Sequence, residues 1–130
     1  MSGLAYADAS ALVKLVVEEA ESAVVFRWFV EVDRVVTSRI GVVETIRASS
    51  RREHSAAYRD QVLDEVDIVE LDVAIARSAA ALGPTTLRTL DAIHLATALA
   101  LGPELDAFVT YDDRLAEAAR AIGLPVVRPA

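Results

Sequence analysis

The chain has 130 residues, which suits one domain around one hydrophobic core, expected to cover residues 1–130. It contains no cysteine, which excludes disulfides and thiolate metal sites, and its two histidines, His54 and His94, are too few for a His-rich zinc cluster. The net charge of −7 argues against non-specific nucleic-acid binding, which depends on lysine and arginine.

Apolar spacing and turn residues divide the chain into alternating strands and helices. The first half predicts a strand over 4–8, helices over 10–19 and 21–32, a strand over 34–38, and helices over 41–53 and 56–66. The second half predicts a strand over 67–71, helices over 73–82 and 89–101, a strand over 107–111, a helix over 113–123 and a short strand over 124–129. This alternation predicts an α/β fold with helices on both faces of a parallel sheet.

The start of the chain and its most apolar helix predict a cytoplasmic protein with no membrane span. The N-terminus lacks a basic start, and Asp8 interrupts its apolar run, so it is not a signal peptide. The uncharged stretch around 89–101 ends at Glu104 and is too short to cross a bilayer. Apolar residues nevertheless make up 54% of the chain, which predicts surplus apolar surface for a partner or a second copy.

Two acidic residues stand at or just after the ends of predicted strands. Asp8 ends the first strand, and Asp112 follows the strand that contains Phe108 and Val109. Ligands of parallel α/β sheets bind beyond the carboxyl ends of the strands. Asp8 and Asp112 are therefore expected to be neighbours in space, although they lie far apart in the sequence.

Two further acids lie in helices that are otherwise apolar on at least one side. Glu44 is close to the apolar side of helix 41–53, and Asp91 lies in helix 89–101, which is apolar all round and expected to be buried. An ionised carboxylate in such a place is costly unless it is paired or bound to a cation. Three or four carboxylates gathered together need positive charge, and magnesium or manganese would supply it.

Each acid also has a purely structural explanation. Asp8, Asp91 and Asp112 lie near helix starts, where they would cap the helix or favour its dipole. Glu44 would pair with Arg47, one turn further along the same helix. Both explanations stay open from the residues alone.

Basic and hydroxyl side chains accompany these acids. A metal ion held by carboxylates binds a phosphate in many nucleases, so Arg47 and Arg51, which follow Glu44 on the same helical side, are expected to contact RNA phosphates. A solvated arginine face is the alternative for Arg51 and Arg52. Ser10 and Thr110 lie two residues from Asp8 and Asp112, where a hydroxyl would bind a carboxylate, although Ser10 would equally cap a helix. His94, one turn after Asp91, would be able to hydrogen-bond a carboxylate, but a structural role is favoured and His94 is kept out of the catalytic set.

Four stretches, taken together, resemble a known family. They are YADASALVKL, VVETIRA, LRTLDAIHLATAL and FVTYDDRLAEA; they span nearly the whole chain and come in the family's order. In this set the chain is similar to PIN domains, specifically the VapC toxins of bacterial VapBC toxin–antitoxin pairs. The resemblance implies a three-layer α/β/α sandwich with a central parallel sheet. It also implies an endoribonuclease dependent on Mg²⁺ or Mn²⁺, in which a metal-activated water attacks the RNA phosphodiester.

The resemblance carries roles to individual residues. Four acids match motif positions and would bind the metal and act in catalysis: Asp8, Glu44, Asp91 and Asp112. Asp113 is an additional metal candidate, and the supporting positions are Ser10, Arg88 and Thr110. The four acidic positions follow the family's pattern, so the resemblance implies an active enzyme.

Family membership would also imply protein partners. A cognate VapB antitoxin would bind an apolar groove and cover the active site, and the chain would form a homodimer. The helices at 10–19 and 21–32 are expected to form part of the antitoxin surface, with Phe26, Trp28 and Phe29. Core packing is the alternative role for these three aromatic residues.

Three other functions remain open from the residues alone. A metal-dependent DNA nuclease would use the same acids. A signalling receiver domain also binds magnesium at strand ends, but its paired acids come early and it needs a late lysine, whereas Lys14 is the only lysine here. A binding module whose acids are only helix caps predicts no metal binding and no loss of function when carboxylates are changed to amides.

Overall fold

The computed structural model of the chain describes residues 3–130 and contains a sheet of five parallel strands in the order β3-β2-β1-β4-β5. The strands are β1 (Leu4–Ala7), β2 (Arg34–Ser38), β3 (Asp67–Val69), β4 (Leu105–Val109) and β5 (Val126–Val127). Every expected strand is present, and the predicted α/β class and parallel sheet are confirmed. β4 starts and ends two residues earlier than the expected 107–111. Its end is early because the Tyr111 N–H donates to the Ser10 side chain and not to a neighbouring strand.

Seven α-helices connect and cover the strands, and every expected helix is present. They are α1 (Ala9–Val16), α2 (Ser22–Glu31), α3 (Arg39–Ser50), α4 (Ala56–Asp64), α5 (Val73–Ala81), α6 (Thr89–Ala100) and α7 (Asp113–Ala121), with a short 3₁₀ turn, η1 (Gly102–Glu104), before β4. The prediction that Ser10 caps the first helix is wrong. α1 begins one residue earlier, because the Asp8 carboxylate accepts the N–H of Ala11.

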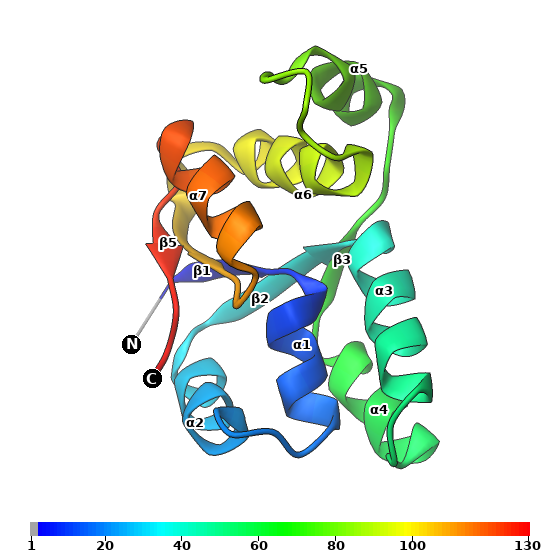
Figure 1. The fold of residues 1–130 in the computed structure, drawn as a ribbon. Coiled ribbons are helices and arrows are strands. Elements are labelled where there is room, and N and C mark those ends of the chain that lie inside the picture. Colours follow the sequence, from blue (N-terminus) through cyan, green and yellow to red (C-terminus); the bar gives the residue numbers. More distant parts are fainter. Residues whose placement is uncertain (1–2) are drawn as a thin grey trace.

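The sheet lies between two layers of helices, as the sandwich prediction requires (Figure 1). Alternate residues of β1 point to opposite faces, so Leu4 and Tyr6 share a core cluster with side chains of α6 and α7. Ala5 and Ala7 face α1 on the other side, in a second cluster with Ala11 and Leu12. Every residue of β1 is buried, as expected for a central strand of a parallel sheet.

The order of the strands places a crevice between β1 and β4. The chain passes from β1 outward to β2 and β3, and then returns to add β4 and β5 on the other side of β1. The connections that leave the carboxyl ends of β1 and β4 therefore diverge, which opens the sheet at this point. Asp8 follows β1 and Thr110 follows β4, so both lie at this crevice.

None of the helices within residues 3–130 combines the length and the apolar character that crossing a bilayer requires.

Candidate active site

Asp8 lies at the floor of the crevice and is held by hydroxyl groups on both sides. Its side chain is buried, with 4% of the residue exposed. Ser10 Oγ donates to one carboxylate oxygen at 2.6 Å, and Thr110 Oγ1 donates to the other at 2.7 Å. Burial raises the pKa of Asp8, and these two hydrogen bonds oppose the rise by stabilising the anion. The predicted pairing of the two hydroxyls with a carboxylate is confirmed.

The same hydroxyls tie the start of the β4–α7 connection to Asp8. Tyr111 N–H donates to Ser10 Oγ at 2.8 Å, and Asp112 N–H donates to Thr110 Oγ1 at 3.1 Å. Two segments that are far apart in the sequence are thus joined through Ser10 and Thr110. This network places Asp112 beside the crevice that contains Asp8.

Asp112 and Asp113 have different surroundings, although they are adjacent. Asp112 is the N-cap of α7, where its carboxylate accepts the N–H of Leu115 at 3.1 Å. The Asp113 side chain is 91% exposed and pairs with Arg128 at 2.7 Å. Asp113 therefore has a cationic partner from the C-terminal segment, in contrast to the acids of the crevice.

Asp91 faces the crevice from the first turn of α6. Arg88, not Asp91, occupies the N-cap position of this helix, so Asp91 does not cap it, but Asp91 does lie in the first turn, as the dipole explanation requires. Burial raises the pKa of Asp91, and the negative charges of Asp112 and Glu44 add to the rise. Electrostatic interactions with His94 and Arg88 oppose the rise. Asp91, Asp112 and Glu44 are thus close enough to repel one another, as a cation-binding site requires.

Glu44 reaches the same region from α3, but its partner differs from the one expected. Its Oε1 lies 2.6 Å from Nε2 of His94, so Glu44 is bound to α6 and not to Arg47 of its own helix. The alternative that His94 hydrogen-bonds a carboxylate is confirmed, although the sequence did not identify Glu44 as its partner. Glu44 and His94 lie 50 residues apart in the sequence, and only the packing of α3 against α6 brings them together.

The acidic side chains fit a hard divalent cation that keeps part of its water shell. The donors are carboxylate oxygens, which magnesium and manganese prefer, and they repel one another in the absence of positive charge. Across residues 3–130, no three acidic or histidine side chains are arranged to ligate a single ion together. Magnesium is commonly bound through one or two carboxylates and several waters, so a pair of these acids is a sufficient protein contribution.

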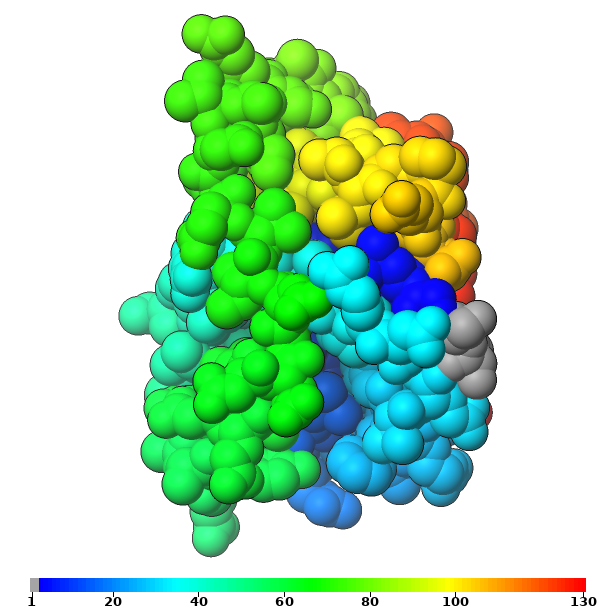
Figure 2. Space-filling model, turned by 180° about the vertical axis from the view of Figure 1, so that it is seen from behind, coloured from blue at the N-terminus to red at the C-terminus, as the bar shows by residue number. Residues whose placement is uncertain are grey.

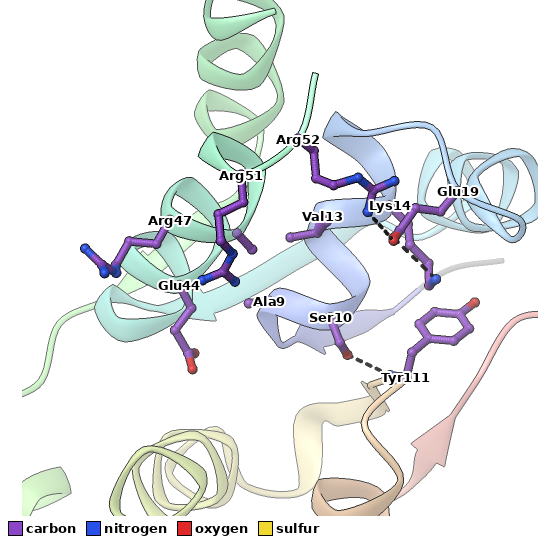
Figure 3. A pocket seen from close by; sticks show the side chains of 11 residues that line it. Ala9, Ser10, Val13, Lys14, Glu19, Glu44, Arg47, Arg51, Arg52 and Tyr111 are labelled. Atoms are coloured by element: carbon purple, nitrogen blue, oxygen red, sulfur yellow. Dashed lines mark hydrogen bonds and ion pairs between the residues drawn. The ribbon is translucent and has the colours of Figure 1, made fainter. Parts of the chain in front are cut away.

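A pocket of about 560 Å³ adjoins the acids, between α1 and α3 (Figure 3). Glu44 and Arg47 line it together with Arg51, which confirms that the two predicted arginines lie beside a site acid. Figure 3 shows Arg51 and Glu44 projecting from α3 toward the side of the pocket where Ser10 lies. The pocket thus has an acidic end and an arginine-rich wall.

Two further cations line this pocket and were missed from the sequence. Lys14 lies one turn after Ser10 on α1, forms ion pairs with Glu19 and Glu21, and stands 4.6 Å above the Tyr111 ring. Arg52 lines the pocket and pairs with Glu19 at 3.2 Å. The spacing of four residues from Ser10 to Lys14 was the available signal, since such residues share one face of a helix.

Comparison with known proteins identifies the family. The PIN domain family model matches residues 5–121. The chain is 40% identical to Ribonuclease VapC46 of Mycobacterium tuberculosis over 95% of this chain and 96% of the relative. The chain is a member of the PIN domain family and of its VapC group. The predicted resemblance is confirmed.

Solved structures agree with this assignment at the level of the fold. Mycobacterium tuberculosis VapC20, a toxin that cleaves the sarcin-ricin loop, superposes with a TM-score of 0.72 at 18% identity, over 96% of this chain and 99% of VapC20. The VapBC-1 structure from nontypeable Haemophilus influenzae gives a TM-score of 0.70 at 13% identity, over 96% and 97% of the two chains. The architecture of this VapC protein is therefore that of known VapC structures.

Proposed function

We propose that residues 1–130 form one PIN domain that acts as the toxin of a type II toxin–antitoxin pair and cleaves RNA as a divalent-metal-dependent endoribonuclease. One observation carries the proposal: in a VapC chain, Asp91 lies close enough to Asp112 and Glu44 for their charges to raise its pKa, and Thr110 joins Asp8 to the segment of Asp112. The name of its relative VapC46 supports a ribonuclease. Helix capping alone does not explain why Asp91 and Glu44 lie beside Asp112.

The four carboxylates are proposed to hold Mg²⁺ or Mn²⁺ at the RNA phosphate. When bound, such an ion lowers the pKa of water and offsets charge on the phosphate. Ser10 and Thr110 fix the rotamer of Asp8, and the buried peptide groups around Asp8 exclude competing solvent. Arg88 lies at the N-cap of α6 and partly balances Asp91.

The arginine-rich wall supplies the RNA contacts in this proposal. Arg47 and Arg51 line the pocket next to Glu44, and arginine binds phosphate oxygens through a planar fork. This local positive wall offsets the net charge of −7, because a phosphate at the pocket interacts mainly with the nearest charges. A strand that enters along α3 would bring its phosphate toward Glu44 and the other acids.

The antitoxin is proposed to bind an apolar groove between α2 and α4. Its lining residues include Leu15, Phe26, Phe29, Val30, Tyr58 and Val62. Phe26 and Val30 are 54% and 68% exposed, whereas Trp28 packs against Phe29 and the core. Figure 2 shows the hollow between the green segment of α4 and the light-blue segment of α2. A VapB-type antitoxin in this groove and a homodimer of the chain complete the proposal.

The decisive experiment is cleavage of single-stranded RNA by the purified chain, freed of antitoxin. We expect cleavage with magnesium or manganese, none with chelator, and a loss of about a hundredfold or more in Asp8→Asn with the fold retained. The matched control is Asp113→Asn, whose carboxylate already pairs with Arg128. Cleavage that survives Asp8→Asn, or that persists in chelator, would contradict the proposal. Preferential cleavage of DNA of the same sequence would favour the DNA-nuclease alternative.

A further inference from the structure

A chain of hydrogen bonds runs from the centre of the sheet to the active site. The Tyr6 hydroxyl lies 2.6 Å from Nδ1 of His94, and Nε2 of His94 lies 2.6 Å from Oε1 of Glu44. Tyr6 is fully buried, His94 is 2% exposed, and 31% of the Glu44 side chain is exposed. The chain therefore begins in the dry core and ends at a carboxylate that faces solvent.

The partners of His94 fix the position of its proton. The Glu44 carboxylate only accepts, so Nε2 of His94 donates to it. Burial raises the pKa of the Tyr6 hydroxyl, so this hydroxyl stays protonated and donates to Nδ1. A neutral imidazole ring has one donor nitrogen and one acceptor nitrogen, which matches an acceptor beside Nε2 and a donor beside Nδ1. Both of its nitrogens are thus used, with the proton on Nε2.

Packing holds the imidazole ring on several sides. Tyr6 meets it edge to face at 5.8 Å between ring centroids, and Tyr6 itself is stacked on Phe108 at 5.2 Å. Gly41 of α3 approaches from the opposite element, where an added Cβ would lie 3.5 Å from Cε1 of His94 and only 2.1 Å from Oγ1 of Thr37. The absence of a side chain at Gly41 therefore lets α3 come close enough for Glu44 to reach His94.

We infer that His94 is a positioning residue, which the Tyr6 hydroxyl holds in its Nε2–H tautomer so that it fixes one oxygen of Glu44 and leaves the other oxygen for the cation. The inference rests on the proposed function, because it assigns Glu44 to the metal site. Carboxylates that bind metals are commonly held by such outer hydrogen bonds. Loss of one commonly lowers metal affinity or activity by about 10–100-fold.

Calorimetric titration of manganese into three variants of His94 and its helix tests the role of the hydrogen bond. His94→Leu removes the donor, and we expect about tenfold weaker binding or more. His94→Gln carries an amide that donates from the position of Nε2, and we expect it to recover most of the affinity. Thr97→Val is the matched control, because Thr97 is buried one turn along α6 and bonds only to the carbonyl of Ile93.

A variant of Tyr6 keeps the aromatic packing, so the inference can still be tested if His94→Leu does not fold. Tyr6→Phe retains the ring stacked on Phe108 and removes only the donor to Nδ1, and we expect about three- to tenfold weaker manganese binding. The signature of the tautomer is read from ¹⁵N NMR of labelled histidine at pH 8. His54, the only other histidine, serves as the internal reference. We expect His94 to show the neutral Nε2–H form alone.

The outcomes separate this inference from the proposed function. Weaker binding in His94→Leu, recovery in His94→Gln and an unchanged Thr97→Val would support the positioning role. Wild-type affinity in a folded His94→Leu variant, equal losses in His94→Leu and His94→Gln, or an Nδ1–H form of His94 would overturn it while leaving the proposed function intact. A wild-type chain that neither binds manganese nor cleaves RNA would overturn both.

Discussion

Asp8 illustrates how one side chain serves structure and chemistry at once. Its carboxylate caps α1 through Ala11, and the same group accepts hydrogen bonds from Ser10 and Thr110 across the crevice. Capping and a role in the site were alternatives for the sequence; the structure shows the cap and leaves it compatible with the proposed role in the site. Asp91 differs, because it caps nothing and lies in an anionic environment.

Asp91 makes stability depend on pH in a predictable direction. Its pKa in the folded chain is raised from the ordinary value of 3.8, so the folded state resists ionisation of this group. Below pH 3.8 the Asp91 carboxyl is neutral in both the folded and the unfolded chain, and the folded state is not penalised. As the pH rises through the raised pKa of the folded state, the carboxyl ionises and this part of the stability is lost. Without divalent ions, we expect Asp91→Asn to have a higher free energy of unfolding than the wild type at pH 7.

Urea unfolding of both proteins between pH 4 and pH 7 checks this prediction. The advantage of Asp91→Asn should shrink as the pH falls, because the wild-type carboxyl then becomes neutral as well. Added manganese should raise the stability of the wild type and leave that of the variant nearly unchanged. An advantage that grows toward low pH would be inconsistent with the repulsion described at Asp91.

Among the elements, α3 is the helix that joins the acids to the arginine-rich wall of the pocket. Gly41 allows its close approach to β2 and α6, Glu44 contacts His94, and Arg47 and Arg51 follow at one-turn intervals along the pocket. A small displacement of this one helix therefore moves an acid and two arginines together.

Gly41→Ala should displace α3 and damage the site. A Cβ at this position would lie 2.1 Å from Oγ1 of Thr37, so helix or strand must move, at a cost of about 1–3 kcal/mol. In an open helix the same change would stabilise by up to about 1 kcal/mol. Ser50→Ala, at the exposed end of α3, is the control and should change the free energy of unfolding by only about a few tenths of a kcal/mol. Unfolding in urea and manganese titration measure both effects, and an unimpaired Gly41→Ala would refute the close approach.

The two arginines of α3 should determine part of the salt dependence of RNA binding. Each phosphate contact to a single strand contributes about 0.7 to the slope of log affinity against log salt. Replacing Arg47 and Arg51 with glutamine should therefore reduce the slope by about 1.4, as measured with a non-cleavable RNA at several salt concentrations. Arg77→Gln, on the exposed side of α5, is the control and should leave the slope unchanged. An unchanged slope in the double variant would place the RNA elsewhere.

At the scale of the whole molecule, the acidic crevice and the apolar groove lie on different sets of elements. The acids lie between β1 and α1, in α3, in α6 and at the start of α7, whereas α2 and α4 form the walls of the groove. Substrate and antitoxin surfaces are therefore separable by mutation. The exposed Phe26 and Val30 also account for part of the apolar surplus noticed in the composition.

Val30→Glu should weaken antitoxin binding without affecting RNA cleavage. Val30 is 68% exposed and lines the groove, so an acid there places an unpaired charge in the apolar interface. We expect roughly a tenfold loss of affinity or more for the cognate antitoxin, measured by calorimetry. Val73→Glu on α5, at a residue that is 67% exposed, is the matched control. Equal losses in both variants would place the antitoxin surface outside the groove.

Much of this arrangement was predictable from the sequence because it is local. Apolar periodicity predicted every strand and helix, and the rule about strand ends brought Asp8 and Asp112 together. The contact between Glu44 and His94 was not predictable, because it depends on the distance between α3 and α6, which the glycine at 41 makes short. Strand ends were also missed where a side chain such as Ser10 captures a backbone N–H of the neighbouring segment.

The central claim is that the gathered carboxylates hold a divalent ion at an RNA phosphate. Calorimetric titration of manganese, with a non-cleavable RNA bound to the chain, tests it most directly in the wild type and in Asp112→Asn. We predict saturable binding in the wild type that is lost or greatly weakened in the variant. Identical binding in the two folded proteins, or none in either, would show that these acids do not form a metal site.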